Sequence, residues 1–337
     1  EGPLDSDTLL QLGGSPERLH SISPGEQLAR VMTTHRGAVD VLPGDVRLRV
    51  PGEMSVTTGD FVTHDGEAVL RVLERRSVLR RQSASASVDE QLLAANVDVA
   101  FLVTSMNRDF NDKRLIRLHA AVASSGVEVV TVLTKADLDL AGQGRYLRQL
   151  DASLPGVPVV VTSATLDLGI EDLQRFLGPG RTGVLLGTSG VGKSSLVNAL
   201  LGEERQEVRA QRESDDRGKH TTTRRELIVL PGGGVILDSP GLRQLALWDG
   251  DGLDEAFSDI VALAERCQFR DCGHDSEPGC AVVEAIEDGS LSEVRLAAWR
   301  KLGREVAWQE KRQRQARMRA ESKAFTKMVR SHKTDRW

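Results

Sequence analysis

The length, composition and spacing of the hydrophobic runs change along the chain and divide it into successive regions. Residues 1–27 have weak periodicity and several Gly, Ser and Pro, which predicts an extension with one short helix. From residue 28 to 81 the apolar runs are short, rich in valine and separated by PGD, PGE, TTGD and HDG, which are turn signals. About five strands in this space predict a small closed barrel of the oligonucleotide-binding type, an OB-fold, although a small β-sandwich would give the same pattern.

A polar segment over residues 82–93 predicts a linker, and strands and helices alternate after it. Near-continuous apolar runs, each followed by an amphipathic or polar stretch, lie at 97–104, 127–134, 157–162, 183–187, 226–230 and 235–238. Such runs are typical of parallel strands that helices cover on both faces. Residues 94–247 are therefore predicted to form a doubly wound α/β domain, and residues 248–337 a mainly helical domain with a cysteine-rich knot.

Composition narrows the class of protein. Of the 337 residues 39% are hydrophobic and 28% charged, which is ordinary for a soluble globular protein. No apolar run approaches the roughly 20 residues that span a bilayer. Three cysteines are too few for a disulfide scaffold, so we expect a monomer in the reducing cytoplasm with no membrane partner.

The net charge of −5 is unevenly distributed along the chain. Residues 300–337 contain 13 Lys/Arg against 4 Asp/Glu, a net charge of +9, so the remainder carries −14. A basic helix or tail on an acidic body favours a polyanionic partner such as RNA, although a solvated helical face would have the same composition.

The stretch GTSGVGKSSL at 187–196 has the G-x-x-x-x-G-K-S pattern of a phosphate-binding loop between a strand and a helix. Its glycines let backbone N–H groups converge on phosphates, and the helix N-terminus adds partial positive charge. Lys193 would reach the β- and γ-phosphates, and the Ser194 hydroxyl would ligate Mg²⁺. The predicted nucleotide-binding residues here are Gly187, Ser189, Gly190, Val191, Gly192, Lys193, Ser194 and Ser195.

Two segments that follow the phosphate loop predict contacts to Mg²⁺ and the γ-phosphate. DSPG at 238–241 comes after an apolar strand, where Asp238 would hold Mg²⁺ through water and the Gly241 N–H would face the γ-phosphate. Residues 203–219 are polar and aperiodic, which predicts a loop that nucleotide or partner binding orders. The threonines that follow at 221–223 could supply one ligand to Mg²⁺, or could simply begin a strand.

Two motifs upstream of the phosphate loop indicate guanine rather than adenine. TKAD at 134–137 matches the N-K-x-D motif of GTPases with Thr134 in place of Asn. Asp137 would accept hydrogen bonds from guanine N1–H and the 2-amino group, which adenine lacks, while the stem of Lys135 packs on the base. TSA at 162–164 would back the base with Ser163 and Ala164. Because these motifs precede the phosphate loop, the sequence predicts a circular permutation.

The knot CQFRDCGHDSEPGC contains every cysteine of the chain within 14 residues. Its C-x₄-C-x-H-x₅-C spacing places thiolate and imidazole ligands at Cys267, Cys272, His274 and Cys280, which suits one structural, tetrahedral Zn²⁺ per chain. Buried or redox-active thiols are the alternative.

Together the barrel, the motif order TKAD, TSA, GTSGVGKS, GKHTTT and DSPG, and the cysteine knot resemble the RsgA (YjeQ) family over about residues 28–330. The resemblance implies a circularly permuted GTPase that acts in late maturation of the small ribosomal subunit. It implies docking on 16S rRNA through the OB-fold, GTPase and zinc domains, and hydrolysis of GTP to GDP that the subunit stimulates and that drives release.

The family assigns water activation to a histidine ahead of the threonines, which here is His220. Leu242, in the place where many GTPases carry a water-orienting Gln, cannot do this because it is apolar. By the same alignment Thr222 is the threonine that contacts Mg²⁺ and the γ-phosphate. Contact of His220 with RNA or solvent is the alternative.

Two other functions remain open on the residues alone. The chain could be a permuted GTPase that acts on the large subunit or on tRNA, or a zinc-stabilised RNA-binding protein that uses GTP as a structural ligand. Intact Lys193, Ser194 and Asp238 argue against the second of these.

Overall fold

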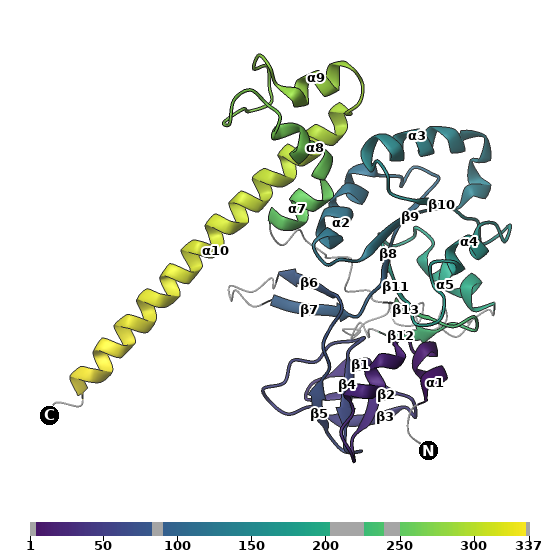
Figure 1. Ribbon diagram of the computed structural model, residues 1–337, viewed down its shortest axis with the longest axis vertical. Helices are drawn as coiled ribbons and strands as arrows, with labels where there is room; N and C mark the ends of the chain where they lie inside the picture. The colour runs from purple at the N-terminus through teal and green to yellow at the C-terminus, as the bar shows by residue number, and fades with distance from the viewer. Residues whose placement is uncertain (1–4, 83–89, 203–225, 239–249, 335–337) are drawn as a thin grey trace, which may run out of the picture.

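A five-stranded antiparallel sheet near the N-terminus closes into a barrel (Figure 1). The computed structural model describes residues 5–82, 90–202, 226–238 and 250–334. The barrel strands, in the sheet order β3-β2-β1-β4-β5, are β1 Gln27–His35, β2 Ala38–Leu42, β3 Val46–Arg49, β4 Phe61–His64 and β5 Val69–Val72. A parallel bridge between Arg49 and Ala68 joins the two edge strands. Because the sheet closes on itself, the predicted OB-type barrel is confirmed over an open sandwich.

Residues 5–26 contain the predicted short helix and pack on two domains. Helix α1 Ser6–Gln11 and the 3₁₀ turn η1 Pro16–Ser21 precede β1. Leu9 of α1 is fully buried against Phe61 of the barrel, and the Leu10 carbonyl accepts a hydrogen bond from Gly180 N–H of the next domain at 2.7 Å. This segment therefore packs between the barrel and the central sheet. The sequence predicted one short helix in this region, and α1 is that helix, but its contacts with two domains leave no pattern in the sequence.

Arg30 of β1 is a buried residue that connects the same N-terminal segment to the barrel and the central domain. Its side chain is fully buried, and its guanidinium donates to the carbonyls of Leu12, Gly59 and Asn96, the latter two at 3.3 and 3.4 Å. Burial lowers its pKa to about 9. These bonds tie the N-terminal segment, the barrel and the start of the central domain to one side chain.

A two-stranded hairpin follows the barrel where the sequence predicted a linker. Strand β6 Val78–Gln82 pairs antiparallel with β7 Glu90–Ala95, from Val78 opposite Ala95 to Gln82 opposite Glu90, with a register shift between Leu79 and Arg80. Residues 90–93 are thus strand rather than linker. Alanine is depleted in strands, so the run EQLLAA did not indicate one. The boundaries of the domains themselves stay a prediction.

The central domain is a six-stranded sheet with helices on both faces (Figure 1). Its strands, in the sheet order β10-β9-β8-β11-β13-β12, are β8 Val99–Ser105, β9 Glu128–Thr134, β10 Val159–Val161, β11 Thr182–Leu186, β12 Glu226–Val229 and β13 Val235–Asp238. All neighbours are parallel except β12, which pairs antiparallel with β13. One face is covered by α2 Asp112–Ala123 and α3 Gln143–Ser153, the other by α4 Ile170–Gln174 and α5 Lys193–Leu201. The predicted doubly wound α/β domain is confirmed.

The C-terminal region is helical, as predicted. Its helices are α7 Gly250–Ala256, α8 Ser258–Ala264, α9 Ala281–Glu287 and α10 Glu293–Thr334. Figure 1 shows α10 running past the body of the molecule as one long helix, about 60 Å at 1.5 Å per residue. None of the helices in the described ranges combines the length and apolar character needed to cross a bilayer.

Buried contacts fix the start of α10 to the central domain. Arg295 is 4% exposed and binds the Asp259 carboxylate through two nitrogens at 2.7 and 2.6 Å. It also donates to the carbonyl of Ser153, the last residue of α3, at 3.0 Å. The Ser292 hydroxyl donates to the Ala152 carbonyl at 2.6 Å. The C-terminal region is therefore attached to the helical layer formed by α2 and α3.

Candidate nucleotide site and metal centre

The predicted phosphate loop links β11 to α5 and depends on its glycines. A Cβ at Gly187 would lie 2.5 Å from the Val103 carbonyl, and Gly192 has φ of 99°, in the left-handed region where other residues are strained. The Lys193 ammonium lies within the loop and donates to the carbonyls of Gly187 and Thr188 at 2.8 and 2.6 Å. The N-terminal turn of α5 begins at Lys193, so its N–H groups and this ammonium face one region suited to phosphate.

The TKAD loop is fastened to the phosphate loop. Thr134 is buried at the end of β9, and its hydroxyl lies 3.0 Å from the Thr104 carbonyl and 2.5 Å from the Val191 carbonyl. A hydroxyl has one hydrogen, so it donates to one of these carbonyls at a time. The Lys135 ammonium donates to the Gly190 carbonyl at 2.6 Å. Thr134, which stands in place of the usual asparagine, and Lys135 therefore both connect the two loops.

Asp137 and the TSA loop lie side by side. The Ser163 hydroxyl donates to Asp137 Oδ1 at 2.5 Å, and the Ala136 N–H donates to the Thr162 carbonyl at 3.1 Å. Ser163 is fully buried whereas Asp137 and Ala164 are exposed. The serine thus orients a carboxylate that remains accessible at the edge of the site, as recognition of a base edge requires.

The predicted Mg²⁺ residues are only partly described by the structure. Ser194 lies in the first turn of α5, and Asp238 ends β13, which pairs with β11 directly beside the phosphate loop. His220, Thr222, Gly241 and Leu242 lie outside the described residues.

Arg114 joins the phosphate loop although the sequence did not indicate it. This residue of α2 places Nη1 3.3 Å from the Thr188 hydroxyl. The two residues are separated by 74 positions, so only the packing of α2 against the sheet brings them together.

The four predicted metal ligands form one cluster. Their ligand atoms all lie within 4.8 Å of one another, and these residues are Cys267, Cys272, His274 and Cys280. Cys267 Sγ is 3.8 Å from Cys280 Sγ, and each of these sulfurs is 3.5 Å from His274 Nδ1. Tetrahedral Zn²⁺ with Zn–S near ~2.3 Å and Zn–N near ~2.05 Å would place sulfurs ~3.8 Å apart and sulfur and nitrogen ~3.5 Å apart. The donor set and its spacing therefore fit zinc.

The ligand loop is held by hydrogen bonds around the cluster. The Glu277 carboxylate accepts from the N–H groups of Gly273 and Asp275, on either side of His274, at 2.8 and 2.9 Å. Backbone N–H groups, first its own and then that of Gly273, lower the pKa of Glu277 to about 2. Arg300 of α10 donates to the His274 carbonyl. The loop is thus bonded both to itself and to the long helix.

Comparison with known proteins decides which family this architecture represents. The family model described as RsgA GTPase matches residues 72–248. The chain belongs to the RsgA GTPase family. It is 40% identical over 343 aligned positions to the small ribosomal subunit biogenesis GTPase RsgA 2 of Vibrio parahaemolyticus, covering 98% of this chain and 94% of that protein. It is 44% identical to the small ribosomal subunit biogenesis GTPase RsgA of Streptomyces avermitilis, covering 84% of this chain and 80% of that one.

Solved structures of similar proteins show the same fold as this RsgA family member. YjeQ from Thermotoga maritima superimposes with a TM-score of 0.64 at 26% identity, covering 84% of this chain and 99% of that one. YloQ, described as a circularly permuted GTPase, gives 0.62 at 25% identity, covering 84% and 96%. The predicted permutation is thereby confirmed, since β9 and β10 with the guanine motifs precede β11 and the phosphate loop.

Proposed function

We propose that this chain is a GTP hydrolase that binds the small ribosomal subunit and acts in its late maturation. The observation that carries the proposal is the direct attachment of the guanine-reading loop to the phosphate loop through Thr134 and Lys135. A site whose base and phosphate subsites share hydrogen bonds suits a nucleotide, and the accessible Asp137 carboxylate, oriented by Ser163, suits guanine. Relatives at 40–44% identity are named small ribosomal subunit biogenesis GTPases.

The residues would divide the work of binding GTP and GDP as follows. Asp137, oriented by Ser163, reads the guanine edge, while Lys135 and Ala164 pack around the base. Lys193 turns from the loop carbonyls to the β- and γ-phosphates, and the N–H groups of the loop and of Gly241 cradle them. Ser194 and Thr222 would ligate Mg²⁺ and Asp238 would hold it through water, and the ion would neutralise phosphate charge.

His220 would complete the site for hydrolysis. Leu242 cannot orient water, so we assign this task to the imidazole of His220, which would hydrogen-bond the attacking water when the subunit is bound. Without the partner, turnover stays slow.

Cys267, Cys272, His274 and Cys280 would hold one structural Zn²⁺. Four protein ligands leave no open position, so the ion stabilises the C-terminal region rather than entering the chemistry. This region, the barrel and the basic helix then dock on 16S rRNA. The protein works in the cytoplasm as a monomer, and no membrane is part of the scheme.

Co-sedimentation with separated ribosomal subunits tests the proposal. The protein loaded with a non-hydrolysable GTP analogue should pellet with the small subunit, should stay in the supernatant with the large subunit, and should be released from the small subunit with GDP. Pelleting with the large subunit alone, or with tRNA in a separate pull-down, would favour a permuted GTPase with another RNA target.

A further inference from the structure

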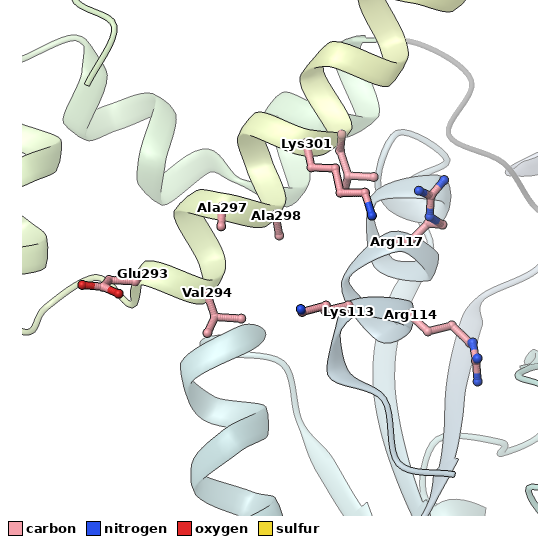
Figure 2. A pocket seen from close by; sticks show the side chains of 9 residues that line it. Lys113, Arg114, Arg117, Glu293, Val294, Ala297, Ala298 and Lys301 are labelled. Carbon is pink, nitrogen blue, oxygen red and sulfur yellow. The ribbon is translucent and has the colours of Figure 1, made fainter. Parts of the chain in front are cut away.

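A groove of about 520 Å³ lies between α2 of the central domain and α10 of the C-terminal region (Figure 2). Four cations line it, Lys113, Arg114 and Arg117 from α2 and Lys301 from α10, against one carboxylate, Glu293. The chain as a whole carries a net charge of −5. The groove is therefore a basic site on an acidic protein.

The two lysines converge on the groove. Figure 2 shows Lys113 pointing from α2 toward α10, Lys301 pointing from α10 toward α2, and Arg114 pointing away from α10. Both lysines are exposed, and no carboxylate in the described part of the chain forms an ion pair with either. Val294 and Ala297 give the wall of α10 an apolar character. The groove thus combines two accessible ammonium groups with a narrow apolar face.

Contacts on either side of the groove hold its walls in place. Arg117 of α2 pairs with Glu305 of α10 at 2.7 Å, which neutralises one of the four cations. Near the start of α10, Arg295 is anchored on Asp259 and the Ser153 carbonyl. Because α10 is fixed to the body, the groove exists before any ligand arrives, and binding costs little reorganisation.

The groove is also connected to the phosphate loop. Arg114, which lines it, contacts the Thr188 hydroxyl at 3.3 Å. Arg114 therefore links α2, which forms one wall of the groove, to the phosphate loop.

We propose that this groove binds a segment of RNA strand, with phosphates on Lys113 and Lys301 and the sugar face against Val294 and Ala297. The proposal rests on the proposed function, since the RNA would be that of the small ribosomal subunit. Charge complementarity favours a polyanion, and a volume of about 520 Å³ lies within the range of pockets that take a nucleotide-sized ligand. The site places part of the RNA docking surface next to the phosphate loop.

The test measures affinity for purified small subunits as a function of salt. Lys113→Ala combined with Lys301→Ala should weaken binding roughly tenfold and make the slope of log affinity against log salt shallower by about one unit per lysine. Arg148→Ala combined with Arg175→Ala removes the same charge from exposed residues of α3 and of the end of α4, outside the groove, and should bind like the wild type.

A second variant fills the groove without changing charge. Ala297 is exposed, so Ala297→Trp should fold, which its melting temperature checks. It should weaken subunit binding several-fold with an unchanged salt slope, because the ring takes the place of the sugar on the apolar wall while both lysines keep their phosphate contacts. If the groove variants bind subunits as tightly as the wild type while the wild type binds normally, the groove proposal is wrong and the proposed function stands. If the wild type binds no small subunit, both the groove proposal and the proposed function are wrong.

Crosslinking identifies what occupies the groove. A photoreactive benzoylphenylalanine in place of Val294 should crosslink to ribosomal RNA, and the same group in place of exposed Asp151 on α3 should not. Crosslinks from Val294 to ribosomal protein alone would overturn the assignment of RNA.

Discussion

The nucleotide site and the metal centre are built by opposite means. The nucleotide site gathers residues from the ends of β9, β10 and β11, and contacts such as that of Thr134 with Val191 join positions 57 residues apart. The metal centre takes all four ligands from a single stretch of 14 residues. The geometry of the nucleotide site therefore depends on the fold of the sheet, whereas the geometry of the metal centre depends on its ligands and a few hydrogen bonds within the loop. Substitutions in the two sites should therefore have different effects.

Removing a metal ligand should give the largest effect. Cys280→Ser should abolish stoichiometric zinc and leave residues 258–290 sensitive to protease, because a structural zinc supplies about 10–16 kcal/mol to a small knot. GDP affinity should be retained, since the nucleotide residues lie on the separate sheet. Metal analysis, limited proteolysis and GDP titration check this.

Ser276→Ala provides the matched control, because Ser276 lies in the same loop and is exposed without being a ligand. It should keep about one zinc per chain. A metal-free Cys280→Ser protein with a protease-resistant C-terminal region would contradict the structural role of the ion.

Asp137→Asn should change nucleotide choice by a large factor. An amide presents a donor where guanine also presents one, so binding should shift from guanine toward xanthine, by as much as ~10⁴-fold in relative affinity. Competition of GTP, XTP and ATP against a fluorescent nucleotide measures the shift. Wild-type protein that binds ATP as tightly as GTP would show that TKAD does not read the base.

The predictions on zinc and on guanine rest on motifs that are visible in the sequence alone. Other features of the structure could not be predicted from such motifs. The cluster that contains Cys267 and Cys280 was predictable because local spacing carries the information, and the apolar strands because burial on both faces leaves continuous runs. Contacts between distant residues leave no pattern. Arg114 reaching Thr188 and the fully buried Arg30 at the barrel junction are set by packing, and neither position is unusual in sequence.

Thr134→Val should test the attachment of the two nucleotide loops. The change keeps the shape and removes the hydroxyl, which leaves a buried carbonyl without its donor and should cost about 1–3 kcal/mol in stability or GTP affinity. Isothermal titration with GTP and chemical denaturation measure the two components.

Thr131→Val on the same strand is the control. The Thr131 hydroxyl is buried and has no hydrogen-bond partner among the described residues, so its removal should be neutral or stabilising. Equal costs for the two variants would mean that the contact between the loops contributes nothing.

Glu277→Gln should give the smallest effect, on the metal centre alone. Both carboxylate oxygens accept from loop N–H groups, whereas the amide keeps only one acceptor oxygen and loses the charge that strengthens these bonds. Zinc affinity measured against a competing chelator should fall several-fold with GTP affinity unchanged. A fall in GTP affinity as well would show that the two sites are not energetically separate.

Single-turnover GTP hydrolysis with saturating small or large ribosomal subunits tests the central claim most directly. The isolated protein should hydrolyse GTP at about 10⁻⁴–10⁻² s⁻¹, as unassisted GTPases do. Small subunits should accelerate this strongly and large subunits little, and His220→Ala should keep GTP and subunit binding but lose most of the acceleration. Equal rates for His220→Ala and wild type would remove His220 from the mechanism. Absence of any stimulation of the wild type by small subunits would contradict the account as a whole.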